Sequence, residues 1–381
     1  MTERARVVVT GVGTVNALGA GGLAAVEAAL EPGRSGIGPV RAFALDDSPS
    51  RLAAEVAPGA LDAHVDRDAA RRLSRIGQLA VAASGLAMAD SGVGAGPHLG
   101  LVVGTELGDF RSSEEFAGGF LRRGPGGLSP MIFPNTVMNS MAAQIAIAVG
   151  AQGPGVTLNQ STVAGDLAVA RAAALVAGGK ATAVLAGGVD EIWGSVYRQL
   201  ARMGVLSPTA GTGPEGCRPF ASDHNGVVLG EGATFLVLEE HGAARGRGAR
   251  VLGEVLGAAW GNVLVAPHTA RPSRRDPRSP VGALLTRLGL GPGTLGACFG
   301  SGNGDPAADD WEVALLSADL RAEGALCPPR SIAPVFGQHG GLGALRVIAA
   351  TLEAGRRRRP ALVHGVARGG CRTAVVVGAS T

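Results

Sequence analysis

The chain is short of the residue types that recognise nucleic acids. Aromatic residues make up 3% of its 381 residues, with a single tyrosine, so a surface that stacks bases or sugars is not expected. Lys180 is the only lysine, and the net charge is only +3. The basic residues form one dense run, Arg356–Arg359. We interpret that run either as a solvated turn after a helix or as a weak docking patch for an acidic partner.

Signals for metals, cofactors and membranes are also missing. Cys217, Cys298, Cys327 and Cys371 lie far apart without CxxC spacing, which argues against a metal or redox site. No apolar run approaches the roughly 20 residues that cross a bilayer, and the N-terminus enters a strand without an apolar signal segment. We therefore expect a soluble cytoplasmic protein with no metal, no cofactor and no membrane or nucleic-acid contact.

What is present is typical of a large α/β protein. The chain is 46% hydrophobic and holds 62 glycines, in short clusters between apolar runs. A buried strand is expected at Arg6–Val9, followed by a glycine turn at Thr10–Gly13. Helical and strand patterns alternate after it. The expected helices are 67–92, 136–149, 163–178, 309–320 and 341–354; the expected strands are 99–103, 156–158, 183–185, 234–239, 251–255 and 373–377.

The order of elements is repeated in the second part of the chain. A strand near Ala297 precedes a glycine turn, two helices and a closing strand, as in the first part. This pattern predicts two similar α/β halves, and the segment 241–250 is the expected boundary. We divide the chain into an N-terminal half, residues 1–245, and a C-terminal half, residues 246–381.

Four segments resemble the β-ketoacyl synthase family, and they occur in the family's order. They are Arg6–Gly19, Ser129–Ile147, Ala186–Glu191 and Gly204–Glu240, the last with its LSP, RPF and GEGA elements. The resemblance implies a thiolase-like fold, in which two similar α/β halves form α-β-α-β-α layers.

The family's catalytic cysteine has no counterpart here. In the family it lies nine residues after the glycine of a Gly-Pro pair, and counting from Gly153 reaches Thr162. Counting back from the pair Gly187-Gly188 reaches the same residue. A threonine hydroxyl is a weak nucleophile at neutral pH and needs an adjacent base.

The family's basic residues are also replaced, as far as the resemblance aligns them. Phe299, in CFGSGNGDPAAD, stands where the first histidine is expected, and Gln338, in GQHGGLGA, where the second is expected. Ala333 takes the place of a family lysine. A shift of one residue would bring His339 into play. Arg368 replaces the family's gating phenylalanine, and we interpret Cys371 nearby as structural.

A ketosynthase-like chain that lacks these residues resembles the chain length factor, the ketosynthase β subunit of type II polyketide synthases. The resemblance implies a catalytically inactive subunit that forms a heterodimer with an active ketosynthase α subunit. It would shape the tunnel that sets polyketide chain length, with an acyl carrier protein delivering the polyketide.

Candidate tunnel residues follow from family position. Leu107, Phe110, Ser113 and Phe116 are spaced to share one helical face, and Ile132, Phe133 and Met138 come from a neighbouring segment. The alternative is that these are ordinary core or dimer-contact side chains.

Two other functions remain open. One is an acyltransferase on the same scaffold, with Ser161 or Thr162 as nucleophile and a base supplied by His339 or by a partner. The other is a subunit that recruits acyl carrier protein without shaping a tunnel. A dinucleotide-binding enzyme is disfavoured, because VTGVGTVNALG lacks the full GxGxxG spacing.

Overall fold

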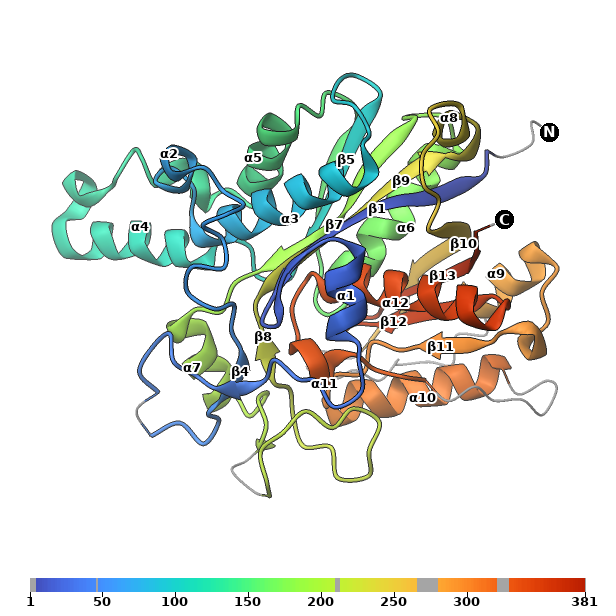
Figure 1. Ribbon diagram of the computed structural model, residues 1–381. Coiled ribbons are helices and arrows are strands. Elements are labelled where there is room, and N and C mark those ends of the chain that lie inside the picture. The colour runs from blue at the N-terminus through green and yellow to red at the C-terminus, as the bar shows by residue number, and fades with distance from the viewer. Residues whose placement is uncertain (1–4, 46, 210–212, 266–279, 321–328, 381) are drawn as a thin grey trace.

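Five layers of helices and strands stack in the described part of the chain (Figure 1). The computed structural model describes residues 5–45, 47–209, 213–265, 280–320 and 329–380. In Figure 1, α3 (Arg75–Ser91) and α5 (Ser140–Val149) form the top layer, α6 (Ala164–Ala177) and α12 (Leu342–Arg357) the middle one, and α10 (Pro306–Leu320) lies at the bottom. α9 (Pro280–Leu288), at the right, shares a hydrophobic core with α10. Separate hydrophobic cores fill the spaces between the layers. The predicted α/β class and its α-β-α-β-α layering are confirmed.

The strands of the two halves follow one order. In the first half they run β6 (Gly155–Asn159), β5 (Leu99–Thr105), β7 (Ala183–Asp190), β9 (Gly232–Glu240) and β1 (Val7–Asn16). In the second half they run β11 (Ala297–Phe299), β12 (Ala361–Val366), β13 (Cys371–Ala379) and β10 (Gly253–Asn262). The pairs β5–β7 and β11–β12 are parallel. The pairs β7–β9 and β9–β1 in the first half, and β12–β13 and β13–β10 in the second, are antiparallel.

The two groups of strands meet at one short seam and differ at one edge. Val7–Val9 of β1 pairs antiparallel with Gly253–Val255 of β10 and joins the groups. Among the described residues, the position of β6 is taken in the second half by a parallel bridge between Phe299 and Arg330. The division at residues 245 and 246 falls within α8 (His241–Gly246) and stays a prediction.

The glycine turn predicted at Thr10–Gly13 is wrong. β1 continues through this segment to Asn16, and all ten of its residues are buried. The glycines are needed because α3 crosses the strand at close range. A Cβ on Gly11 would lie 2.6 Å from Ser91 Cβ, and one on Gly13 would collide with the Ala83 carbonyl oxygen.

Local sequence explains where several helices begin and end. The helix predicted over 67–92 is divided into α2 (Arg67–Ala70) and α3, whose first turn is capped by the Ser74 hydroxyl. α3 ends at Gly92, which has φ +65°, a backbone conformation that favours glycine. The smaller elements are β2 (Gly19–Gly21), α1 (Leu23–Ala29), β3 (Gly38–Pro39), β4 (Leu52–Ala54), α7 (Gly194–Arg202), β8 (Leu229–Gly230), α11 (Ala333–Phe336) and the 3-10 helices Gly124–Gly127, Phe133–Thr136 and Pro292–Thr294.

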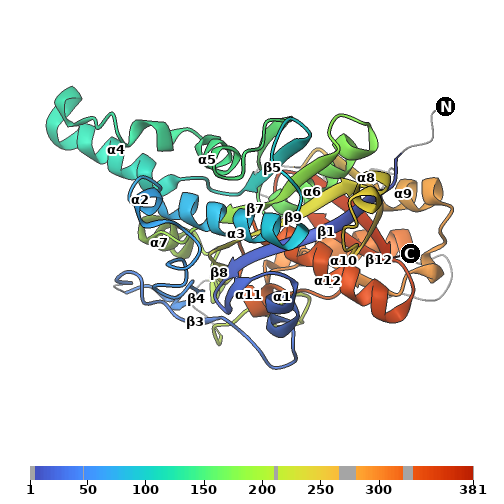
Figure 2. The same cartoon turned by 45° about the horizontal axis from the view of Figure 1, so that its top comes forward.

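One segment, residues 107–139, projects from the layered body, and we call it the arm. It contains α4 (Phe110–Arg123), which extends away from the sheets in both views (Figures 1 and 2). Among the described residues, most of the large apolar side chains left exposed lie on the arm: Phe110, Phe120, Leu121, Leu128, Met131, Phe133, Val137 and Met138. No described helix is long and apolar enough to cross a membrane.

Candidate functional site

The turn at Thr162 connects β6 to α6. Thr162 has φ +59°, a left-handed conformation that is uncommon and costly for a β-branched residue. Such conformations cluster at functional sites, where the surrounding structure enforces them. Among the described residues, the only hydrogen bond of the Thr162 hydroxyl is with Ser161 Oγ, at 3.2 Å. No described base therefore contacts this hydroxyl.

The N-terminal ends of α6 and α12 pack against each other next to Thr162. A Cβ on Gly165 would lie 2.5 Å from the Gly340 carbonyl oxygen, so glycine allows the close approach. Arg346 of α12 forms a buried ion pair with Asp166 of α6 and donates to the Thr162 carbonyl oxygen at 3.3 Å. A buried guanidinium paired in this way fixes the position of the turn against the second half of the molecule.

Gln338 lies beside this crossing and is buried. Its Oε1 accepts a hydrogen bond from Asn303 Nδ2 at 3.3 Å, and its Nε2 donates to Glu106 Oε1. The backbone N–H of Asn303 donates to Asp309 at 3.0 Å, so a carboxylate at the start of α10 holds the loop. Hydrogen bonds thus connect Asn303, Gln338 and Glu106 in series. The side-chain amides of Asn303 and Gln338 cannot act as bases.

Two carboxyl groups complete the polar interior. Asp190 accepts hydrogen bonds from Thr105 Oγ1 at 2.6 Å, from the Gly340 N–H at 2.7 Å and from the N–H of Glu106 at 3.1 Å. Burial raises the pKa of Asp190 above its usual range. Burial, and then the nearby Asp190 charge, raise the pKa of Glu106 to about 8, against hydrogen bonds from Gln338 and the Thr162 N–H that lower it. Glu106 therefore carries its proton at neutral pH and is not a base for Thr162.

His339 does not supply a base either, which corrects the role that the acyltransferase alternative gave it. Its Nδ1 accepts the Gly341 N–H at 3.0 Å, and its ring packs close to Gly232 and Gly341. Burial lowers the pKa of His339 to about 3, so the ring is too weak a base to accept a proton from a hydroxyl at neutral pH. These contacts keep the ring in the wall formed by β9 and α12.

The other positions named from the sequence lie in different surroundings. Phe299 ends β11 and Ala333 begins α11, and both belong to the hydrophobic core around α12. Thr162 and Gln338 are thus brought together through Glu106, whereas Phe299 and Ala333 are not part of this chain of contacts. Burial raises the pKa of Cys371 to about 11, which leaves its thiol a poor nucleophile.

Arg368 connects its own loop to the loop that carries Asp305. Its Nε and a terminal nitrogen bind the Asp305 carboxylate at 2.6 and 2.8 Å, a bidentate pair. Ala367 and Cys371, on either side of Arg368, pack against Val163 in a small apolar cluster. The loop that carries Arg368 therefore covers the residue that follows Thr162.

The seven candidate tunnel residues gather on the arm and at its base. Phe116 of α4 stacks against Phe133, with ring centroids 5.6 Å apart. The Met138 sulfur accepts from Asn159 at 3.9 Å, which links the arm to the end of β6. The expectation that Leu107 shares a helical face with Phe110 is wrong, because α4 begins at Phe110 after its Asp109 cap. The remaining members are Ser113, which is part-buried, and Ile132, which precedes Phe133.

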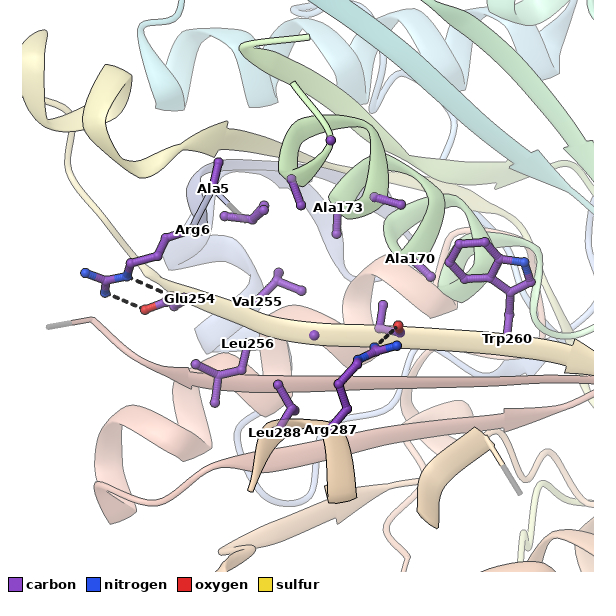
Figure 3. A pocket seen from close by; sticks show the side chains of 16 residues that line it. Ala5, Arg6, Ala170, Ala173, Glu254, Val255, Leu256, Trp260, Arg287 and Leu288 are labelled. Carbon is purple, nitrogen blue, oxygen red and sulfur yellow. Dashed lines mark hydrogen bonds and ion pairs between the residues drawn. The ribbon is translucent and has the colours of Figure 1, made fainter. Parts of the chain in front are cut away.

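A cavity of about 500 Å³ lies elsewhere, between the C-terminal half of α6 and β10 (Figure 3). Alanines of α6, including Ala170 and Ala173, face the aliphatic residues of β10 across it. The Trp260 ring stands at one end, and the Arg6–Glu254 ion pair at the other. Thr162 precedes the opposite end of α6, so this cavity is separate from the turn.

Comparison with known proteins identifies the family. The model of the β-ketoacyl synthase N-terminal domain matches residues 4–244. The 3-oxoacyl-[acyl-carrier-protein] synthase 2 of Synechocystis sp. is 30% identical over 360 residues, covering 92% of this chain and 86% of the relative. The chain therefore belongs to the β-ketoacyl synthase family.

Two solved structures agree with this in their fold. The ishigamide ketosynthase/chain length factor superposes with a TM-score of 0.86 at 24% identity, covering 99% of this chain and 100% of that one. A type II polyketide synthase acyl-carrier protein in complex with its ketosynthase bound to the hexaketide gives 0.83 at 20% identity, with the same coverage. These likenesses confirm the predicted thiolase-like ketosynthase fold and no more.

The sequence reasoning missed Glu106 and Asn303, the two residues that hold Gln338. Glu106 lies in GTELGD, directly after β5, and Asn303 in a glycine-rich loop after β11. A usable signal was the pair Asp309 and Glu312, three residues apart on α10. These carboxylates accept hydrogen bonds from the backbone N–H groups of Asn303 and Ser301, both at 3.0 Å, and so hold the loop in a defined conformation.

Proposed function

We propose that this chain is a catalytically inactive, ketosynthase-like chain length factor. It pairs with an active ketosynthase and shapes the tunnel that limits polyketide length. The observation that carries the proposal is the Thr162 turn, where a hydroxyl replaces the thiol and a protonated Glu106 with an amide at Gln338 stands beside it. Carbon–carbon bond formation by this family needs a thiolate and basic side chains, and the described site offers neither.

The arm and the neighbouring edge strand supply a surface for the ketosynthase. Leu121 and Met131 are 82% and 85% exposed, which is unusual for large apolar side chains on one projecting segment. Among the described strands, β6 pairs only with β5, and its Gly155 and Asn159 are exposed. An unpaired strand edge next to an apolar surface favours association with a second, similar chain. The structural neighbour named as a ketosynthase/chain length factor supports this kind of partner.

The delivery of the polyketide is assigned to an acyl carrier protein. The neighbour described as an acyl-carrier protein in complex with its ketosynthase supports this partner in kind. The curated 3-oxoacyl-[acyl-carrier-protein] synthase 2 relative points to the same kind of carrier. The carrier would bring its acyl chain to the ketosynthase thiol, since this chain has none at position 162.

The tunnel is assigned to the face of the arm that adjoins the Thr162 turn. Phe116 and Phe133 are in ring contact, and Met138 lies between Gly108 and Asn159 at the base of the arm. Large apolar side chains at the end of a tunnel stop a growing chain by steric contact. Leu107, Phe110, Ser113 and Ile132 would complete this wall.

Native mass spectrometry tests the partnership. This chain would be co-expressed with the ketosynthase encoded beside its gene, and we expect a one-to-one heterodimer of unequal masses. A self-sufficient homodimer that ignores the ketosynthase would contradict the proposal. Attention would then move to an acyl adduct at Ser161 or Thr162.

Product length tests the tunnel. Phe110→Ala and Phe116→Ala each remove a ring from the proposed wall, so we expect polyketides longer by at least one extension unit. The matched control is Arg122→Ala on the same helix, whose side chain is exposed and lies outside both the proposed wall and the apolar surface of the arm. Unchanged product length in both phenylalanine variants would favour a subunit that only recruits acyl carrier protein.

A further inference from the structure

The Thr162 turn retains one part of an acyl-transfer site. A backbone N–H at a tight strand-to-helix turn is the type of donor that binds the carbonyl oxygen of an acyl group as negative charge develops on it. Here the turn leads into α6, whose N-terminus adds a partial positive charge. Thr162 keeps the left-handed backbone, φ +59°, that such a turn requires.

The side chain of Glu106 occupies that position. The carboxyl group lies close enough to the Thr162 N–H for this N–H to lower its pKa, and Gln338 Nε2 donates to its Oε1. Gln338 is itself fixed, because its N–H donates to the Val228 carbonyl at 2.8 Å and Asn303 donates to its Oε1. Glu106 is therefore held from both sides, by residues far apart in the sequence.

The backbone of Glu106 is held as firmly as its side chain. Its N–H donates to both oxygens of Asp190 at 3.1 Å. The raised pKa keeps its carboxyl group neutral at pH 7. A neutral carboxyl group presents a C=O of the same polarity and size as the carbonyl of an acyl thioester, so it satisfies the same donors.

We propose that Glu106 closes this chain's own acyl site by filling the place where the carbonyl oxygen of an acyl thioester would bind the Thr162 N–H. The site is thus blocked as well as disarmed. A cysteine restored at position 162 would not be acylated while Glu106 is present. In a heterodimer, the block would direct every acyl group to the ketosynthase. That consequence rests on the proposed function, whereas the block itself concerns this chain alone.

Acylation of a restored thiol tests the block. The full chain carrying Thr162→Cys would be incubated with the N-acetylcysteamine thioester of octanoic acid. In this exchange the thiolate attacks the thioester carbonyl, an S–acyl bond forms at position 162, and N-acetylcysteamine leaves as its thiol. Intact mass and peptide mass spectrometry then give the rate at position 162, separately from the other cysteines.

We expect slow acylation with Thr162→Cys alone and at least a tenfold faster rate when Glu106→Gly is added. Glu106→Gln is the matched control, because it fills the same space and should stay slow. Alkylation by iodoacetamide, which develops no oxyanion, separates general access to the thiol from acyl binding. Thermal unfolding verifies that each variant is folded.

Equal acylation rates with and without Glu106→Gly would overturn the proposal, as would acceleration by Glu106→Gln of the same size. If Glu106→Gly lowers stability too far, Glu106→Ala removes the same carboxyl group and is judged by the same rates. The readout is independent of the ketosynthase, so a failure here is distinguishable from a missing heterodimer.

Discussion

The two halves of the molecule share a plan but differ in what they add to it. β5, β7, β9 and β1 recur as β11, β12, β13 and β10, with the same relative directions. The first half adds a full strand, β6, where the described residues of the second half show a bridge at Arg330. It also carries the arm, with most of the exposed apolar side chains. The shared part builds the fold and the helix crossing, whereas the unshared part carries the surface proposed to bind a partner.

The largest effect is expected from the buried Arg346–Asp166 ion pair, which connects α12 of the second half to α6 of the first. Arg346→Ala would leave Asp166 charged and buried without its partner, so we expect the free energy of unfolding to fall by about 3–5 kcal/mol. Urea denaturation measures it. The control is Arg357→Ala on the same helix, because Arg357 pairs with Glu353 at an exposed site and should cost less than about 1 kcal/mol. A similar small loss for both would mean that the halves are held together by apolar packing alone.

The arm is the second place to test the difference. Leu121→Asp combined with Met131→Asp would put two charges on the proposed interface, so we expect binding to the ketosynthase to weaken about a hundredfold, or ~2.7 kcal/mol. Isothermal titration calorimetry measures the dissociation constant. Val313→Asp, on α10 of the second half, is the control for adding charge to an exposed apolar site. Equal weakening by the control would contradict the assignment of the interface to the arm.

The pH dependence of stability gives the smallest expected effect. Glu191 is buried, neither of its oxygens has a hydrogen-bond partner in the described part of the chain, and burial raises its pKa to about 8. A folded pKa above the unfolded value means that the stabilisation is complete at low pH and is lost as the pH rises through 8. Between pH 6.5 and pH 8 this group should cost about 1–2 kcal/mol of stability.

Glu191→Gln removes that titration, and its unfolding free energy should therefore fall less between pH 6.5 and pH 8 than that of the unchanged chain. Urea denaturation at the two pH values measures the slope. Glu114→Gln is the control, because Glu114 is an exposed carboxylate of α4. Identical slopes in all three proteins would rule out the raised pKa of Glu191.

The extent to which the site could be predicted depended on how far apart its residues are in the chain. Thr162 was reached by counting from a Gly-Pro pair in the same segment, and Gln338 from the glycines around it. Glu106 was missed because its partner Gln338 lies 232 residues away, and no local pattern announces that contact. His339 had the right chemistry for a base, and its burial and its contacts with Gly232 and Gly341 excluded that role.

Periodicity and residue identity are local properties, so the sequence alone predicts the α/β class, the repeated order of elements and the absence of a thiol at position 162. It predicted a turn in β1 where α3 packs closely against glycines, since a glycine does not reveal which of its uses applies. The tertiary structure alone decided that Glu106 faces the Thr162 N–H, that Arg346 joins the halves and that the arm stands clear of the core. Each of these depends on contacts between segments that the chain brings together only when both halves are folded.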